Sequence, residues 1–175
     1  MTGCDRLGLR FLEWAVGTQQ MERLKLITPT TNEEWDSYHR IRREVLFEAR
    51  GHFGVYDPNR PDEKAPNKYP KLLVVSGEPV GVVRIDIDSR VAALRRVAIR
   101  ADVQRLGHGR ALLNLVEQFA REAGCTQLVS SVAPDAVGFY ERFGFVAGER
   151  NVNERGPGDS VFMTRPIDPV GEDSR

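Results

Sequence analysis

The chain of 175 residues has little of what marks disulfide, metal or membrane proteins. Two cysteines, Cys4 and Cys125, and three scattered histidines are too few for a disulfide framework or for usual metal-ligand spacing. No apolar run is long and unbroken enough to cross a membrane. Neither sign of charge is in excess, because 25 basic residues balance 25 acidic ones, so nothing favours nucleic acid or a membrane surface as a partner. We therefore expect a reduced, metal-free, cytoplasmic protein.

The composition that is present suits one folded domain. Hydrophobic residues make up 41% of the chain, enough to form a core at this length. We expect the domain to span residues 21–166. Residues 1–20 are expected to be a leader or an over-extended start, because charged residues interrupt the apolar stretch 7–16; an amphipathic docking helix is the alternative. Residues 167–175 are expected to form a loose tail.

Hydrophobic periodicity predicts an α+β fold, with a mixed sheet and helices on its faces. Thr31 or Asn32 is expected to cap a first helix that Gly51 terminates. The stretch from His52 to Pro70 contains four prolines and is expected to be irregular through most of its length. Strands are predicted at 24–27, 71–76, 80–88, 91–100, 127–132, 145–148 and 160–164, a long helix follows residue 109, and a short helix covers 135–143.

The most informative segment is the loop from Gln104 to Gly109, between the 91–100 strand and an amphipathic helix. The start of a helix has unpaired N–H groups and partial positive charge, so it can bind an anion without a cationic side chain. Arg110 stands where a Walker A loop needs lysine, and Leu112 where a dinucleotide fingerprint needs a small residue. The loop is therefore interpreted as a pyrophosphate cradle, with an ordinary glycine-containing turn as the alternative.

Two motifs resemble the GNAT superfamily of N-acetyltransferases. Gln104-x-x-Gly107-x-Gly109 resembles the family's Gln/Arg-x-x-Gly-x-Gly/Ala loop. The segment from Ala136 to Phe145 is similar to its Ala-x-x-Phe-Tyr-x-x-x-Gly-Phe stretch, and the order and separation of the two motifs also fit. The resemblance implies a central mixed, mostly antiparallel sheet flanked by helices, and an acetyltransferase that uses acetyl-CoA as co-substrate and no metal.

In this family the pyrophosphate of coenzyme A lies on the loop before the main helix, and the pantetheine arm follows the preceding strand. The resemblance therefore assigns the pantetheine to Val97, Ala98 and Ile99. Arg105 and Arg110 could add charge-assisted contacts with phosphate, or be exposed arginines that bind nothing. The residues that the resemblance assigns to the phosphate cradle are Gln104, Arg105, Leu106, Gly107, His108, Gly109 and Arg110.

Tyr140 matches the family's tyrosine that is placed to protonate the departing thiolate. With an ordinary pKa of about 10, a phenol could do so only slightly uphill. The alternative is a tyrosine that packs its ring and leaves its hydroxyl at the surface. Residues 92–96, where many members carry a base, include no carboxylate, so Asp86 or Asp88 could act as a base, or be ordinary solvent-facing residues. Ala133 replaces a frequent asparagine, so one contact with the cofactor is missing.

The predicted function is direct acetyl transfer, in a ternary complex, to the amine of a small polar or amino-acid-like molecule. Cys125 lacks a histidine signature, so a covalent intermediate is not expected. The region from Tyr38 to Tyr69 is expected to shape the acceptor pocket. One alternative is a catalytically silent acyl-CoA sensor. Another follows from Arg42-x-x-Val45-x-Phe47, which resembles acyl-homoserine lactone synthases. The GNAT resemblance also suggests a homodimer.

Overall fold

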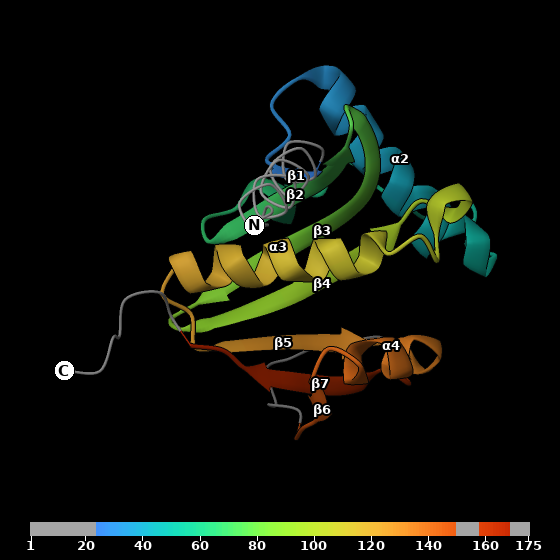
Figure 1. Ribbon diagram of the computed structural model, residues 1–175. Coiled ribbons are helices and arrows are strands. Elements are labelled where there is room, and N and C mark those ends of the chain that lie inside the picture. The colour runs from blue at the N-terminus through green and yellow to red at the C-terminus, as the bar shows by residue number, and fades with distance from the viewer. Residues whose placement is uncertain (1–23, 150–157, 169–175) are drawn as a thin grey trace, which may run out of the picture.

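The computed structural model describes residues 24–149 and 158–168, which form a sheet covered by helices on both faces (Figure 1). The described strands make a seven-stranded sheet in the order β1-β2-β3-β4-β5-β7-β6. Within it β4 and β5 pair in parallel, and the other neighbours pair antiparallel. The predicted α+β fold with a mixed, mostly antiparallel sheet is confirmed. The strands are β1 (Leu24–Ile27), β2 (Lys68–Val75), β3 (Glu78–Asp88), β4 (Val91–Ile99), β5 (Gln127–Val132), β6 (Val146–Ala147) and β7 (Val161–Pro166), and the α-helices are α2 (Asn32–Leu46), α3 (His108–Glu122) and α4 (Val137–Glu141).

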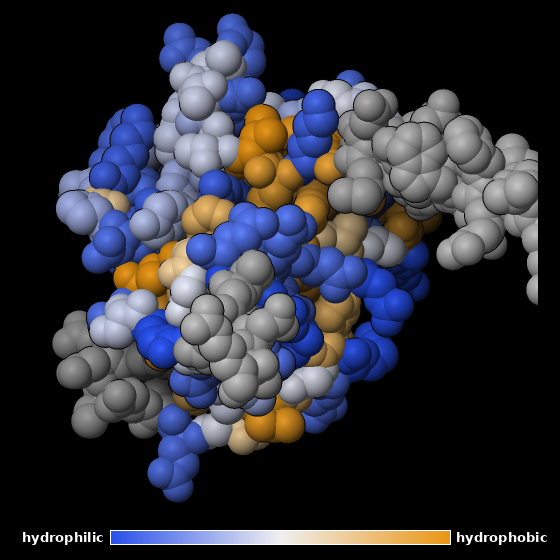
Figure 2. Space-filling model, turned by 60° about the vertical axis from the view of Figure 1, so that its left-hand side comes forward, coloured by the Kyte–Doolittle hydropathy of each residue, from blue (hydrophilic) through white to orange (hydrophobic). Residues whose placement is uncertain are grey.

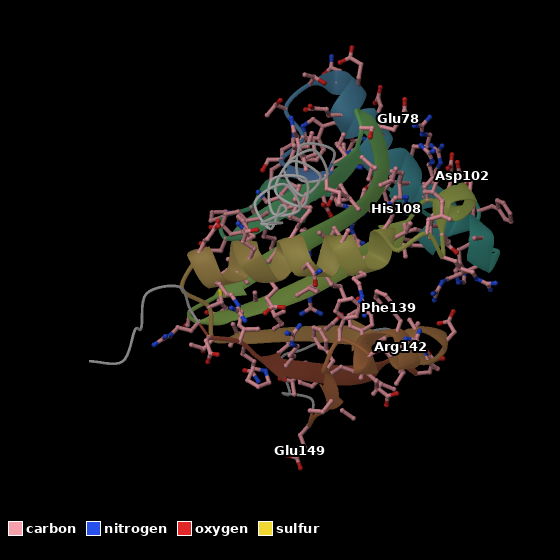
Figure 3. All side chains as sticks on the ribbon, viewed as in Figure 1. Glu78, Asp102, His108, Phe139, Arg142 and Glu149 are labelled. Carbon is pink, nitrogen blue, oxygen red and sulfur yellow. The ribbon has the colours of Figure 1, made fainter. Side chains whose placement is uncertain are left out.

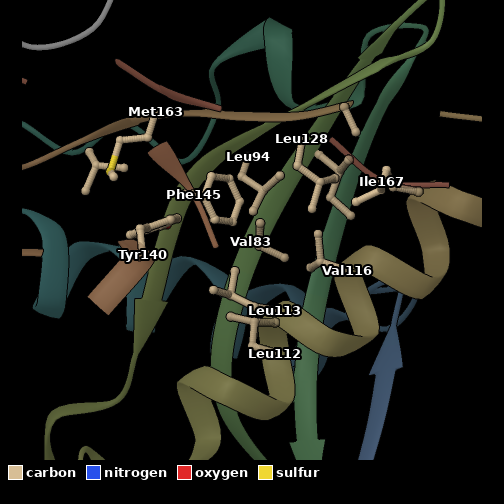
Figure 4. Close-up of a cluster of buried hydrophobic side chains, with 14 of the residues drawn as sticks. Val83, Leu94, Leu112, Leu113, Val116, Leu128, Tyr140, Phe145, Met163 and Ile167 are labelled. Atoms are coloured by element: carbon tan, nitrogen blue, oxygen red, sulfur yellow. The ribbon is translucent and has the colours of Figure 1, made fainter. Parts of the chain in front are cut away.

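Each face of the sheet has a hydrophobic core of its own. Helix α3 covers the larger one, in which Leu112 and Val116 pack against Leu94 (Figure 4). Helix α2 covers the other face, where Tyr38 and Ile41 are fully buried. Successive residues of a strand point to opposite faces, so a single strand such as β3 supplies both cores. The two faces can therefore serve different ligands.

The start of α2 follows from its sequence. Thr31 is the N-cap, its hydroxyl accepts a hydrogen bond from the N–H of Glu34 (3.2 Å), and the Glu34 carboxylate accepts one from the N–H of Thr31 (3.1 Å). This reciprocal capping box confirms the predicted cap. The α-helix ends at Leu46, and a 3-10 turn (Glu48–Arg50) follows before Gly51, whose φ of 79° only glycine adopts readily.

The predicted loop between α2 and the second strand is shorter than expected. Strand β2 begins at Lys68 and includes Pro70, so the expectation of irregular structure was wrong at this end. Proline lacks the N–H that a central strand needs, but β1 pairs only with residues 72–75 of β2. Pro70 therefore lies where β2 is an edge strand. The remaining segment contains one 3-10 turn, Pro61–Lys64.

The C-terminal elements keep their predicted order. Helix α4 is shorter than the expected 135–143 because a 3-10 turn (Pro134–Ala136) precedes it. Ile167, which the sequence assigned to the tail, is buried, and its N–H donates to the carbonyl of Thr126 (2.9 Å). Ile167 therefore packs with the core rather than in a loose tail. The predicted leader, 1–20, and residues 169–175 of the predicted tail lie outside the described residues.

The surface of the described residues is mostly hydrophilic on the face that Figure 2 shows, with apolar residues in several separate groups. None of the described helices combines the length and the apolar character needed to cross a bilayer. Across 24–149 and 158–168, no three His, Cys, Asp or Glu residues gather as metal ligands would. The feature that points to a site is the divergence of two central strands.

Candidate functional site

Strands β4 and β5 form a split in the middle of the sheet. Their parallel pairing runs from Val91 and Gln127 to Leu94 and Ser130, and no later residue of either described strand pairs across it. Both strands nevertheless continue, and Figure 1 shows them spreading apart toward the start of α3 and toward α4. The facing edges of the two strands therefore have backbone groups without a partner in the sheet.

The edge of β4 in this split carries two of the predicted cofactor-binding residues. The N–H of Arg100 donates to a carbonyl of β3 (2.8 Å), so by antiparallel alternation Ala98 also directs its polar groups to β3. Val97 and Ile99 then direct theirs into the split. The side-chain amide of Gln104 donates to the Ile99 carbonyl (3.0 Å) and fixes the loop entrance. The structure thus brings Val97 and Ile99 to the split, while the backbone of Ala98 faces away from it.

The loop that follows presents a row of unpaired N–H groups. Arg105 and Gly107 have φ values of 64° and 87°, and Gly107 is the N-cap of α3 with no capping side chain. The first hydrogen bond into the loop is donated by Ala111, to the Gly107 carbonyl (3.1 Å). The N–H groups of residues 105–110 donate to no acceptor in the described part of the chain. Their convergence at the positive end of a helix dipole suits an anion.

Side chains leave this cradle open. Arg105 and Leu106 are exposed, and Arg105 makes no ion pair with any described residue. The Arg110 guanidinium lies 5.6 Å from the centre of the Phe143 ring. An exposed cation held by an aromatic ring alone can still reach an anionic ligand.

The two sequence motifs meet in space at Gly109. A Cβ added there would lie 3.0 Å from Cζ of Phe139, which is closer than ordinary packing. Figure 3 shows Phe139 on α4 beside the start of α3, where His108 is labelled. Glycine at 109 therefore lets α4 pack against the cradle, which gives a physical reason for the two motifs to occur together.

Tyr140 follows Phe139 and points into the core. Its ring makes edge contacts with Phe139 and Phe145 and is buried (Figure 4). Burial raises the pKa of Tyr140 to about 12, and the neighbouring Ser130 side chain opposes the rise. Ser130 belongs to the last pair of the β4–β5 ladder and donates to the Leu94 carbonyl (3.1 Å). Tyr140 is thus buried beside the vertex of the split rather than exposed at the surface.

The opposite face of the sheet holds a buried ionic cluster around Glu63, which we call the Glu63 cluster (Tyr38, Arg42, Glu63 and Arg84). Arg42 donates to both carboxylate oxygens of Glu63 (2.6 and 2.8 Å), Arg84 donates at 3.0 Å and the Tyr38 hydroxyl at 3.1 Å. Burial alone would raise the pKa of Glu63, but the hydrogen bonds and charge of Arg42, with the charge of Arg84, hold it below its usual range. One carboxylate thus fastens the segment after α2 to α2 and β3.

Asp86, predicted as a candidate base, belongs to the same polar face. Its oxygens accept from Arg84 Nε (2.8 Å) and Lys68 Nζ (3.0 Å), and Arg95 Nε lies 4.0 Å away. The alternative of an ordinary solvent-facing residue is wrong, because the side chain is mostly buried. The base role of Asp86 stays a prediction.

An aromatic pair lies beside the Glu63 cluster, within the region that the sequence predicts to shape the acceptor pocket. Nδ1 of His39 and the hydroxyl of Tyr56 are 2.7 Å apart, and the Tyr56 ring lies 5.7 Å from the Arg42 guanidinium. Burial, with the charge of Arg42, lowers the pKa of His39. These contacts were not predicted from the sequence. Tyr38 and Arg42 lie one turn apart on the apolar side of α2, and this position indicates that Arg42 is buried. A buried arginine needs a carboxylate partner, which is the signal that could have led to the cluster.

An open cleft of about 360 Å³ lies beyond the end of β5. Arg50 and Asp135 approach across it, with 3.8 Å between Nη2 and Oδ1. The cleft is lined by Arg50, Ala133, Pro134, Asp135, Asp159 and Ser160.

Cys125 lies outside this cleft and is fully buried. Burial raises the pKa of its thiol, so Cys125 is not an activated nucleophile.

Comparison with known proteins agrees with this geometry. The Acetyltransferase (GNAT) family model matches residues 27–145, more than half of the chain. The protein therefore belongs to the GNAT family of acetyltransferases. The chain is 27% identical over 139 residues to the uncharacterized protein YyaT of Bacillus subtilis strain 168, covering 79% of this chain and 93% of that protein.

Solved structures share the fold. The ribosomal-protein-S18-alanine N-acetyltransferase of Escherichia coli is 20% identical, with a TM-score of 0.65 and coverage of 87% of this chain and 99% of that one. The PaiA N-acetyltransferase of Thermoplasma acidophilum, solved in complex with coenzyme A, is 14% identical, with a TM-score of 0.63 and coverage of 82% and 99%. At these identities the likeness shows the fold alone.

Proposed function

We propose that this acetyltransferase moves the acetyl group of acetyl-CoA directly to the amine of a small polar acceptor. The observation that carries the proposal is the row of unpaired N–H groups at residues 105–110, next to the split between β4 and β5. In the reaction a C–N bond forms as the thioester C–S bond breaks. The nitrogen loses one proton and the sulfur gains one, so the products are an N-acetyl amine and free thiol.

The residues present fit coenzyme A. The N–H groups at 105–110 would hold its pyrophosphate, and Arg105 and Arg110 would add charge-assisted contacts to phosphate oxygens. The backbone groups of Val97 and the N–H of Ile99 would hold the pantetheine amides, as an added strand does. An N–H on the same edge could also stabilise the oxyanion that develops on the thioester carbonyl.

Tyr140 is proposed as the group that stabilises the departing sulfur. A pKa of about 12 makes full proton transfer to a free thiolate uphill by about 5 kcal/mol, more than an ordinary phenol would require. We infer that the buried hydroxyl acts as a hydrogen-bond donor to sulfur while the C–S bond breaks. A charge-assisted bond of this kind contributes about 1.5–3 kcal/mol.

Isothermal titration with acetyl-CoA, followed by a broad amine panel read by thiol release, tests the proposal. We expect binding with saturable, amine-dependent release of thiol. Absence of binding at millimolar acetyl-CoA would refute it. Binding without amine-dependent release would instead support a silent acyl-CoA sensor, which the pairing of Asp86 and the alanine at 133 favour as the second candidate.

A further inference from the structure

Strand β4 contains a bulge that changes which face its side chains take. The register with β3 shifts between Val82 and Arg84, and Arg96 opposite them has a φ of 53°. Arg95 lies near Asp86, and the Arg96 guanidinium lies 5.8 Å from the Phe47 ring at the end of α2. Two consecutive arginines therefore point to the α2 face, which a regular strand does not allow.

This backbone conformation is unfavourable for arginine. Residues other than glycine rarely adopt a positive φ, and holding one there costs about 1–3 kcal/mol. Such strain collects at binding and catalytic sites. The next residue, Val97, directs its backbone into the split and packs its side chain in the α3 core. The bulge thus places an arginine on one side and the proposed thioester-binding edge on the other.

Arg96 is a cation without a counter-ion. Glu63 pairs with Arg42 and Arg84, and Asp86 pairs with Arg84, Lys68 and, at 4.0 Å, Arg95. Among the described side chains, no carboxylate forms an ion pair or hydrogen bond with Arg96. Burial and the charges of Arg42 and Arg84 lower the pKa of Arg96, and the charge of Glu63 opposes this, but a guanidinium stays protonated at any physiological pH.

The neighbouring Glu63 cluster also has an unmet donor. The side chain of Arg42 is 2% exposed, and its Nε finds no acceptor in the described part of the chain. A partly buried guanidinium that no described carboxylate pairs, as at Arg96, favours an anionic ligand and disfavours a polycationic one.

We propose that Arg96 binds a carboxylate of the acceptor, so that the substrate is an amino acid or a similar amino-carboxylate rather than a polyamine. The inference rests on the proposed function and names its substrate class. Arg96 directly precedes Val97, whose backbone would face the thioester, and its guanidinium extends from this point of β4 toward Phe47 at the end of α2. A guanidinium fork matches a carboxylate with two parallel hydrogen bonds.

The test uses matched acceptors and matched variants. Each L-amino acid of a panel is compared with its amide, which keeps the amine and side chain and removes the carboxylate charge. For the wild type we expect kcat/KM at least about tenfold higher for the acids, as one charge-assisted bidentate contact provides. Arg96→Gln should bring the acid-to-amide ratio near one, and Arg95→Gln, on the same strand, should leave it unchanged.

Comparing ratios between variants cancels the different amine pKa values of acids and amides. Arg96→Lys keeps the charge without the fork and should retain part of the preference. Arg96→Asn tolerates positive φ and serves as a second neutral variant if Arg96→Gln is unstable. The affinity for acetyl-CoA, measured by titration, should be the same in all of them.

Wild-type protein that acetylates amides as well as acids would overturn this inference while leaving the acetyltransferase intact. An acid-to-amide ratio unchanged in the neutral Arg96 variants would do the same. If no panel member is acetylated, titration of the amino acids into the protein loaded with coenzyme A decides. Binding that weakens at least about tenfold in Arg96→Gln supports the inference, and absence of binding overturns it. Failure to bind acetyl-CoA would remove the proposed function itself.

Discussion

Replacing Glu63 by glutamine tests whether one buried carboxylate holds the segment after α2 against α2 and β3. Glu63 is 4% exposed and accepts four hydrogen bonds, two of them from an arginine that is 2% exposed. Glutamine keeps the volume and one acceptor oxygen but removes the charge. Arg42 then stays buried without a counter-ion, whereas Arg84 keeps its contact with Asp86.

The expected cost follows from this difference. Removing one partner of a buried ion pair destabilises a protein by about 3–5 kcal/mol, and the remaining amide oxygen places this case near the lower end. For a chain of this size, about 3 kcal/mol corresponds to a fall in Tm of roughly 6–12 °C. Glu48→Gln is the matched control, because Glu48 pairs with Arg43 at 3.2 Å while both side chains are about a third to a half exposed. It should cost less than about 1 kcal/mol.

Thermal unfolding followed by circular dichroism at pH 7 and at lower pH provides the assay. The folded pKa of Glu63 is lowered, so its stabilisation is complete above the ordinary carboxyl pKa and is lost as the pH falls through the folded value. The gap between wild type and Glu63→Gln should therefore be full at pH 7 and shrink below about pH 4. Equal Tm values at pH 7, or a gap independent of pH, would refute the reasoning.

Three further predictions concern the site itself. Tyr140→Phe should lower kcat about 100-fold and change acetyl-CoA affinity by less than about threefold, by steady-state kinetics and titration; unchanged kcat would mean that another group serves the sulfur. Gly109→Ala should lower the free energy of unfolding in urea by about 1–3 kcal/mol and weaken coenzyme A binding, because its Cβ meets the Phe139 ring. The control Gly138→Ala, with open space around its Cβ, should do neither. The pKa of His39 is lowered in the folded protein, so below about pH 6.5 the unfolded chain binds the proton more readily than the folded one, and the stability of the wild type should fall. His39→Gln should lose less stability than the wild type between about pH 7.5 and 5.5, and equal losses would contradict the assignment.

The sequence alone could predict the features that depend on local pattern. In β3 the side chains alternate between the two faces of the sheet, as the sequence predicts. The observed bounds of β5, Gln127–Val132, are the predicted ones. The cap at Thr31 and a helix start at the end of the 104–109 loop follow from the backbone N–H groups that a helix leaves unpaired, although α3 begins slightly earlier than predicted, at His108. The interpretation of the loop as a pyrophosphate site depended on the second motif, Ala136 to Phe145. The structure gives the physical link between the two motifs, because Phe139 of the second motif packs closely against Gly109 of the first.

Features that depend on distant partners could not be predicted in this way. Glu63 and Arg42 are 21 positions apart. The sequence around each of them contains several residues of the same charge and does not show which acidic residue pairs with which basic one. The bulge at Arg96 depends on the register with β3, which alternation along β4 alone does not reveal. Pro70 joins a strand only because β1 is too short to reach it.

The most direct test of the central claim is an amide-resolved NMR titration of the protein with coenzyme A and, separately, with pantetheine, which lacks the pyrophosphate. If the helix start holds the pyrophosphate, the largest shifts with coenzyme A fall on the amides of residues 105–110, and pantetheine leaves those amides in place while shifting Val97 and Ile99. Coenzyme A that leaves the amides of 105–110 unmoved, or moves them no more than pantetheine does, would contradict the account.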